Sequence, residues 1–416
     1  MKSIRLIGSL AMAVAMAMAL TAGEARADCG IPSGSVRILA NDFAALRIVI
    51  AAAQQCASPS VSITANETTE HQSLQVPALQ ITPAAYTAVF VANNSIFPLM
   101  NKGLIRPLDD LIAKYGKNLT PDQLVKVDGK VMAVAVDINA EHLFYREDIL
   151  QKAGLPPPTS YEQILAAAKT IRDKGLMQYP LAATDKAGWY IAAEFVNMYF
   201  GYGGQLFKAG SAAPNINNAK GVAALNMMKA LTAYMAPDYS TYSADEMNKV
   251  YMAGRTAIMN QWGSVADTVI DPKGAAPDVA ANTVLAAAPT VGGGQTPAGA
   301  LWWDGFSIAR NISDADAEAS FRALMHGIQP AVARAHPDDA TWLASGYQPG
   351  TGSAGVLATA HAHPQSYPMV PYMDLLHAAL GTELPQFLLG RESAEAALAN
   401  VEAAYIASAR ESGFLR

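Results

Sequence analysis

The segment at residues 35–55, SVRILANDFAALRIVIAAAQQ, decides the fold class. Residues 36–40 form a short apolar run that contains the β-branched Val36 and Ile38, which predicts a strand. Residues 43–55 then form a longer, mostly apolar run that predicts a helix. A strand that leads directly into a helix is the repeating unit of parallel α/β sheets, so we look for the same unit further along the chain.

The unit recurs, and the alternation predicts a parallel sheet with helices on both of its faces. The middle of the chain then becomes helix-rich, and a low-complexity stretch predicts a loop before a strand returns. The further expected elements are strands at residues 61–64, 86–91 and 301–309, helices at residues 74–79 and 96–100, and the loop at residues 271–300.

Polar pairs follow each of the three N-terminal strands. Ligands of parallel sheets bind at the carboxyl ends of the strands, so these residues are candidates for a site. Asn and Asp also favour ordinary turns, and for any single pair that interpretation stays open. Three pairs in register favour a site; they are Asn41-Asp42, Asn66-Glu67 and Asn93-Asn94.

Length and composition narrow the class of protein. A chain of 416 residues suggests two or three domains, and its 51% apolar residues can build a large core, which excludes wholesale disorder. The net charge of −6 gives no electrostatic reason to expect nucleic acid as a partner.

The N-terminus has the pattern of a secretory signal peptide. Lys2 and Arg5 precede an uncharged apolar run at residues 6–20, and Ala25-Arg26-Ala27 forms a small-x-small cleavage pattern. The run is shorter than the roughly 20 residues that a spanning helix needs. We therefore expect a signal peptide at residues 1–27, cleavage after Ala27 and a protein exported to the bacterial periplasm.

The two cysteines are placed for a disulfide. Cys29 precedes the first predicted strand, and Cys56 ends the first predicted helix. The helix returns antiparallel to the strand, so its end lies near the start of the strand, and export places both thiols in an oxidising space. Two free buried thiols are the alternative.

Six segments in order along the chain match known patterns, and the most specific is AGLPPPTSYE at residues 153–162. Together they resemble the sugar-binding, maltose-binding-protein-like group of extracellular solute-binding proteins of ABC importers. The other segments are VDGKVMAV (127–134), DIN with LFYRED (137–148), GGQLF with PNIN (203–217), YMAGRTAIM (251–259) and SAEAAL (393–398).

The resemblance implies a two-lobe periplasmic binding protein fold in which each lobe is a mainly parallel sheet flanked by helices, hinged at a central cleft. It places residues 28–138 and 296–330 in lobe one and residues 139–295 and 331–416 in lobe two. It further implies a substrate-binding component that captures a sugar or related polyol by hinge closure. Delivery would be to the transmembrane subunits of an ABC permease. We expect a monomer without catalytic residues, cofactor or metal.

A sugar offers hydroxyls, which need carboxylate or amide partners, and C–H faces, which need flat aromatic rings. In the resembled family a tryptophan at the position of Trp262 often faces the ligand, and Gly263 beside it would let ligand approach the backbone. The alternative for Trp262 is core packing. Trp302-Trp303-Asp304 is unusual, because adjacent strand residues point to opposite faces, so one of these tryptophans belongs to the core.

The remaining candidates share a place at a strand end, a helix start or the expected hinge. For Glu67 and His71 an exposed pair is the alternative, and for Trp189 it is helix packing. Tyr372 lies where the resembled family often carries a stacking aromatic. The full set of ligand-binding candidates is Asn41, Asp42, Glu67, His71, Asn94, Asp137, Asn139, Trp189, Trp262, Gly263, Trp302, Trp303, Asp304 and Tyr372.

Several other chemistries lack support in the sequence. Gly292-Gly293-Gly294 is followed by no Gly-Lys-Ser/Thr, so it is not a phosphate loop. His361-Ala362-His363 has no third ligand nearby, and no Gly-x-Ser-x-Gly elbow is present. Two alternative functions stay open: a secreted carbohydrate-active enzyme, which needs two carboxylates across a cleft, and a binding protein for a cationic ligand such as a polyamine.

Overall fold

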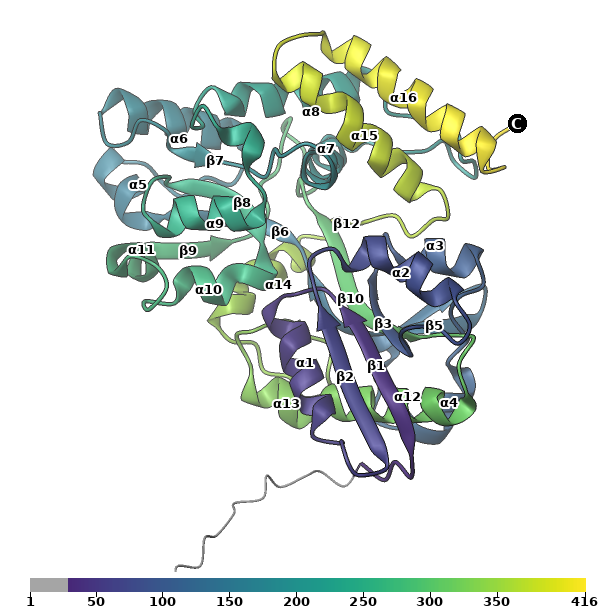
Figure 1. Cartoon of the computed structure of the whole chain (residues 1–416). Helices are drawn as coiled ribbons and strands as arrows, with labels where there is room; N and C mark the ends of the chain where they lie inside the picture. Colours follow the sequence, from purple (N-terminus) through teal and green to yellow (C-terminus); the bar gives the residue numbers. More distant parts are fainter. Residues whose placement is uncertain (1–28) are drawn as a thin grey trace, which may run out of the picture.

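The computed structural model describes residues 29–416, which fold into two α/β lobes (Figure 1). The N-terminal strands lie in the lower lobe of the figure, and the helix-rich middle of the chain lies in the upper lobe. The expected signal peptide and its cleavage site lie outside the described residues. Within the described part, no helix combines the length and the apolar character needed to cross a membrane.

One sheet, with the strand order β11-β5-β10-β3-β1-β2, forms the base of the first lobe. β1 pairs in parallel with both β2 and β3, but β10 is antiparallel to β3 and β5, so the sheet is mixed rather than mainly parallel. The reason is that β10 enters from the second lobe and runs away from the junction. The strands are β1 (Gly34–Ala40), β2 (Val61–Glu67), β3 (Ala88–Ala92), β4 (Leu124–Val127), β5 (Lys130–Asn139), β10 (Ala300–Ile308), β11 (Thr341–Trp342) and β12 (Gln365–Ser366).

Helices cover both faces of this sheet, and each face has its own apolar core. The buried residues of α1 recur at the spacing of one helix face; they include Ala45, Leu46, Val49, Ile50 and Ala53. That face packs in the same core as β1 and α12. The helices of this lobe are α1 (Ala44–Gln54), α2 (His71–Gln80), α3 (Ile96–Asn101), α4 (Asp109–Tyr115), α12 (Asp314–Gly327) and α13 (Pro330–Ala335).

The second lobe contains a smaller sheet with the order β7-β8-β6-β9, in which only β7 and β8 are parallel. The expected loop at residues 271–300 is wrong in part, because α11 and β9 lie inside it; Val284 and Leu285 let this segment pair with β6. The strands are β6 (Glu141–Arg146), β7 (Leu181–Ala182), β8 (Ile258–Trp262) and β9 (Thr283–Ala286).

Helix α7 (Trp189–Gly201) runs through the centre of this lobe, since every residue from Ile191 to Gly201 is buried. The C-terminal helices α15 and α16 pack together on its outer side (Figure 1). The other helices are α5 (Glu147–Ala153), α6 (Tyr161–Asp173), α8 (Ala219–Thr232), α9 (Ala244–Met252), α10 (Ala266–Ile270), α11 (Pro277–Asn282), α14 (Ala354–His361), α15 (Met373–Leu388) and α16 (Ala394–Glu411).

The chain crosses between the lobes on paired strands. β5 runs towards the junction and continues into β6 of the second sheet after a single intervening residue, Ala140. β11 then pairs with β5, and α13 packs in the first lobe's core, so residues 331–342 belong to the first lobe and not, as expected, to the second. We propose residues 29–139 and 300–342 as the main parts of lobe one.

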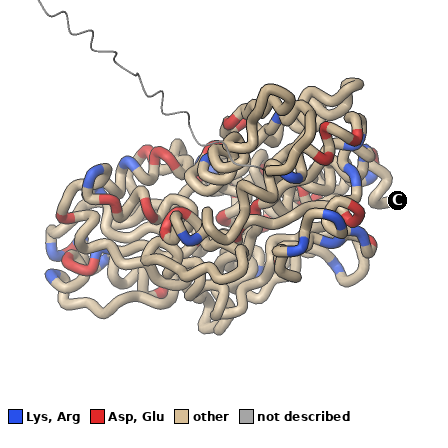
Figure 2. The backbone as a smooth tube through the Cα atoms, turned by 90° about the horizontal axis from the view of Figure 1, so that it is seen from below, with Lys and Arg blue, Asp and Glu red and all other residues tan. Residues whose placement is uncertain are grey.

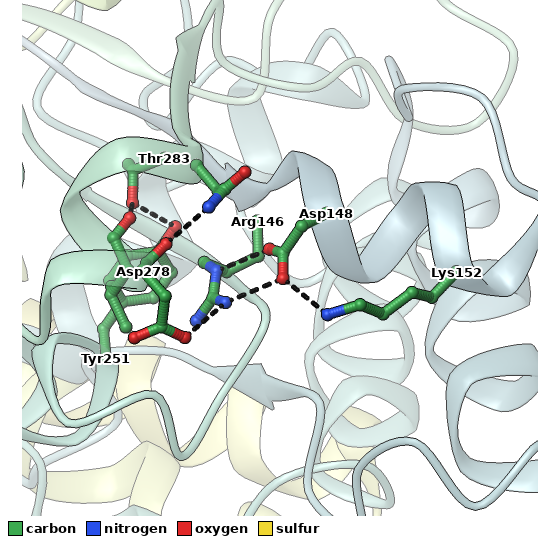
Figure 3. Close-up of polar contacts among 8 residues, drawn as sticks. Arg146, Asp148, Lys152, Tyr251, Asp278 and Thr283 are labelled. Atoms are coloured by element: carbon green, nitrogen blue, oxygen red, sulfur yellow. Dashed lines mark hydrogen bonds and ion pairs between the residues drawn. The ribbon is translucent and has the colours of Figure 1, made fainter.

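An ion-pair network holds the end of β6 that lies away from the junction (Figure 3). Arg146 donates from Nε and Nη2 to the two carboxylate oxygens of Asp148, at 2.8 and 2.9 Å, and from Nη2 to Asp278 at 3.1 Å. Lys152 donates to Asp148 from the next helical turn. The Tyr-Arg-x-Asp part of the family-like segment therefore has a structural role in this chain.

Charges of both signs are interspersed along the backbone at both ends of the molecule (Figure 2).

A disulfide joins Cys29 to Cys56, with their Cα atoms 5.4 Å apart. It ties the segment before β1 to the end of α1. Among residues 29–416, one group of three potential metal ligands occurs, formed by Cys29, Cys56 and His326. The sulfur atoms of both cysteines are already joined in the disulfide.

The disulfide closes a loop of 27 residues in sequence separation, so it restricts the unfolded chain. We expect the Cys29→Ala/Cys56→Ala variant to lose about 3 kcal/mol of unfolding free energy. Guanidinium denaturation of the oxidised protein and the variant measures this difference. An unchanged midpoint in the variant would show that the crosslink contributes nothing to stability.

Candidate functional site

The junction brings together residues that are far apart in the sequence. Trp302 of β10 lies opposite Asn139 at the end of β5. Two residues after Asn139, β6 begins with Glu141, which lies opposite Trp262 at the end of β8. Three of the predicted site residues, Asn139, Trp262 and Trp302, therefore lie at the place where the strands cross.

Three tryptophans form the centre of an aromatic cluster at this junction. The ring centroids of Trp189, Trp262 and Trp302 lie 5.6–5.8 Å apart, and Tyr367 stacks on Trp302 with its centroid at 3.8 Å. Trp262 and Trp302 are only 8% and 5% exposed. The rings thus pack against one another, and they come from α7, β8, β10 and the segment before α15. With His377, these residues are called the aromatic cluster below.

His377 is the polar member of the cluster. Burial lowers the pKa of His377 to about 4, so its ring is neutral at pH 7. Its Nε2 lies 3.0 Å from the carbonyl oxygen of Trp189, an acceptor, so Nε2 carries the proton. Nδ1 then accepts from the Tyr367 hydroxyl at 2.5 Å. The indole Nε1 of Trp189 is buried without a partner.

Trp302 and Trp303 diverge, as strand geometry requires. Trp302 packs into the core of the second lobe, whereas Trp303 packs against a core cluster of the first lobe. The backbone N–H of Trp303 donates to Asn93 Oδ1 at 2.9 Å, and Asn93 Nδ2 donates to the Tyr367 carbonyl at 3.2 Å. Asn93, one of the polar residues that follow the third strand, therefore links the first sheet to the aromatic cluster.

The carboxyl ends of β1 and β2 carry an interacting pair of acids, Asp42 and Glu67. Asp42 forms an ion pair with Arg47 and is about half exposed, while Glu67 is partly buried. Burial, and then repulsion from Asp42, raises the pKa of Glu67 against the opposing effect of Arg47. Asn41 accepts the backbone N–H of Asp42 at 2.9 Å, which is a turn contact.

His71 and Asn94 lie at the same edge, where His71 is buried with its Nδ1 lacking a hydrogen-bond partner and Asn94 is bonded to a helix. His71 is 6% exposed, so the expected alternative of a surface pair does not apply to it, and burial lowers its pKa to about 4. Asn94 exchanges two hydrogen bonds with Gln72 of α2, at 3.2 and 3.3 Å. The structure therefore fixes Asn94 against a helix.

Asn139 joins the lobes by hydrogen bonds, and Gly263 beside it packs within the second lobe. Asn139 donates to Ser264 Oγ at 3.1 Å and accepts the Ser264 backbone N–H at 3.2 Å. A Cβ at Gly263 would lie 2.0 Å from Cγ2 of Val356, so protein fills the space beside this glycine. Gly263 also lines a small cavity beside Asp137, and the approach of ligand to its backbone stays a prediction.

Tyr372 is not part of the aromatic cluster. Its ring meets the edge of Phe207 at 4.7 Å, and its hydroxyl donates to the Ser211 carbonyl at 3.3 Å. These neighbours belong to the second lobe's own core. The residue that stacks at the junction is Tyr367, five positions earlier. This segment has no strand periodicity, so its residue pattern does not distinguish the two tyrosines.

Sequence reasoning missed three buried acids in the second lobe, Glu141, Asp185 and Glu194. They are 0%, 4% and 5% exposed. Asn197 Nδ2 donates to Glu141 at 2.7 Å, and Thr184 donates to Glu194 from its hydroxyl at 2.7 Å. The signal in the sequence was Glu141, an acid that lies two residues before the apolar pair Leu143-Phe144 of a strand.

Burial raises the pKa of all three acids, and mutual repulsion adds to this effect for Glu141 and Asp185. Asp185, Glu194 and Asn260 line a cavity of about 30 Å³ whose other walls are mostly apolar. This is space for about one water molecule. Glu141 Oε1 and Asn260 Oδ1 have no hydrogen-bond partner, so the cluster has unused acceptor capacity.

Comparison with known proteins gives a family match. A family model described as "Bacterial extracellular solute-binding protein" matches residues 59–329. A probable ABC transporter-binding protein of Deinococcus radiodurans is 27% identical over 144 residues, 33% of this chain and 34% of the relative. The sn-glycerol-3-phosphate-binding periplasmic protein of Agrobacterium fabrum is 28% identical over 113 residues, 24% and 26% of the two chains. The matches thus span about a third or less of these relatives.

Solved structures share the whole fold. A solute-binding protein of Agrobacterium radiobacter K84 in complex with ribitol has a TM-score of 0.74 at 19% identity, covering 90% of this chain and 98% of its own. Maltose-bound MalE3 of T. maritima has a TM-score of 0.76 at 16% identity, covering 90% and 99%. A solute-binding protein of Agrobacterium vitis S4 with bound D-mannitol has a TM-score of 0.74 at 19% identity, covering 92% of this chain and 100% of its own. These likenesses show the two-lobe fold.

The buried acids predict a specific pH dependence. They keep protons in the folded state at pH values where the unfolded chain has lost them, so the free energy of unfolding falls as pH rises above about 4. Glu194→Gln removes one such group while its Oε1 can still accept from Thr184. For each pH unit, we expect the unfolding free energy of the variant to fall by up to about 1.4 kcal/mol less than that of the wild type.

Urea unfolding at pH 5, 6, 7 and 8 measures the slope. Glu395→Gln is the matched control, since Glu395 is an exposed acid at the start of α16 and should leave the slope unchanged. If Glu194→Gln kept the full slope of the wild type, Glu194 would be ionised in the folded protein.

Proposed function

The chain belongs to the bacterial extracellular solute-binding protein family, and from this premise we propose that it captures a sugar or related polyol between its two lobes. The observation that carries the proposal is the aromatic cluster at the lobe junction, with Asp304 and Asp137 of the crossing strands beside it. Rings suit the C–H faces of a sugar, and carboxylates accept from its hydroxyls. Ribitol-, mannitol- and maltose-bound neighbours of the same fold support the ligand class.

The ligand would contact both lobes only when the hinge is closed. Because it would bind the closed state more tightly than the open state, it would shift the population towards the closed state. In the structure the rings of Trp189, Trp262 and Trp302 contact one another. Ligand would therefore enter by separating these rings and replacing ring–ring contacts with ring–sugar contacts.

The proposal extends to location and partners. The N-terminal pattern and the extracellular family together support export to the periplasm, followed by delivery of the ligand to the transmembrane subunits of an ABC permease. We propose that the protein is a monomer that binds without turnover, because hinge closure and release require no covalent chemistry. The ligand-binding roles of Asp42, Glu67, Asp137, Trp189 and Trp262 are part of the same proposal.

A thermal-shift screen of the mature protein tests the ligand class. The panel contains neutral sugars, polyols, sugar acids and polyamines. A ligand at a hundred times its dissociation constant adds about 2.7 kcal/mol of stability, which is a readable shift. We expect hits among the sugars or polyols; a response confined to polyamines would overturn the proposed class.

Trp262→Leu tests the site with the best hit of that screen. Loss of a stacking ring should weaken binding at least tenfold, which is about 1.4 kcal/mol, as measured by calorimetry. Phe144→Leu is the matched control, because Phe144 is a buried ring on the neighbouring strand β6, paired with Met259 further from the junction. It should lower stability and leave affinity unchanged. Equal affinities for both variants would place the ligand elsewhere.

A further inference from the structure

Two carboxyl groups face each other on the strands that cross between the lobes. Asp137 of β5 lies directly opposite Asp304 of β10 in the antiparallel ladder, next to a register shift between Asp304 and Gly305. Directly opposite residues in such a ladder have neighbouring side chains. Asp137 is 2% exposed, and its Oδ1 has no hydrogen-bond partner.

No cation compensates this pair among the described residues that contact it. On the far side of Asp304, β3 contributes Ala92, and on the far side of Asp137, β11 contributes Trp342. A small cavity beside Asp137 has walls without lysine, arginine or histidine. The titratable groups around that cavity are Asp338, whose Oδ1 accepts the Gly352 N–H, and Tyr347 and His142 close by.

The nearby titratable groups cannot supply the missing positive charge. Asp338 is itself an acid, and Tyr347 is a neutral phenol whose hydroxyl lies 2.5 Å from Ser353 Oγ. Burial lowers the pKa of His142 to about 4, so its ring is neutral at pH 7. Asp137 is buried and Asp304 is partly buried, and the two lie opposite each other in the ladder. With only neutral and acidic neighbours, ionising both carboxyl groups at once costs free energy.

We propose that Asp137 and Asp304 share one proton at neutral pH and act as a single proton-dependent clasp between the two crossing strands. The protonated member donates to the ionised one, which replaces a repulsion between β5 and β10 by a hydrogen bond. Burial, followed by repulsion from Asp304, raises the pKa of Asp137 well above its usual range, and burial raises that of Asp304 to about 7. Such a pair titrates in two steps that belong to both groups.

The clasp lies on the hinge itself. Asp137 is three residues before Ala140, where the chain passes into the second lobe, and Asp304 is on the strand that returns from it. Loss of the shared proton therefore weakens strand pairing at the point about which the lobes move. The inference concerns the protein without ligand, so it can fail or hold independently of the proposed function.

Equilibrium unfolding between pH 5 and 9 tests the clasp by comparing the wild type with Asp137→Asn/Asp304→Asn. The unfolded chain holds no proton on these residues above pH 5, so a shared proton makes the unfolding constant of the wild type rise tenfold per pH unit relative to the double variant. The ratio of the two unfolding constants should stop growing above the pH at which the wild type loses the shared proton. Asp110→Asn, which changes an exposed acid of α4 in the same lobe, should follow the wild type.

Two results would overturn the proposal. An identical pH dependence in wild type and double variant would mean that both carboxyls are ionised, and a hundredfold difference per pH unit would mean that each holds its own proton. Carbon-13 NMR of the wild type with labelled aspartate gives a readout that does not depend on variants folding. Sharing requires two carboxyl resonances that move together at the same upper pH step; two unrelated single steps would contradict it.

Discussion

The antiparallel pairing of β5 with β10 is the constraint on which the rest of the structure depends. β5 continues into the second sheet after one residue, and β10 begins at the junction. Their ladder therefore belongs to the first sheet while their ends determine where the second sheet starts. Because hydrogen-bonded strands resist sliding but can twist, this arrangement fixes the register of the two lobes and leaves rotation between them as the available motion.

Several polar atoms of the second lobe are buried without hydrogen-bond partners. They are Trp189 Nε1, Glu141 Oε1 and Asn260 Oδ1. A buried polar group without a partner costs about 1–3 kcal/mol. Under the proposed function, a ligand with hydroxyl groups would satisfy such atoms if it reached them, whereas an apolar ligand would not. This cost supports the proposal of a hydroxyl-rich ligand.

The sequence predicted most of the architecture because strand–helix alternation and paired cysteines are local signals. It placed Trp189, Trp262 and Trp302 in a site, and the structure brings these three together. It could not predict the mixed sheet, because strand direction depends on which lobe a strand comes from. It also missed Tyr367 and the buried acids, since a residue's partners across the fold leave no periodic trace in the chain.

Trp302 shows how closely the two lobes share one core. Its backbone belongs to the first sheet, opposite Asn139, but its ring packs in the core of the second lobe. Asn93 makes a second link in the same direction. It lies in the first lobe and donates to the backbone carbonyl of Tyr367, whose ring belongs to the core of the second lobe. In the proposed hinge motion, separating the lobes would break these contacts, so this conformation has a stabilising energy of its own. A ligand that entered as proposed would need to add only the difference between its own contacts and the ring–ring contacts that it displaces.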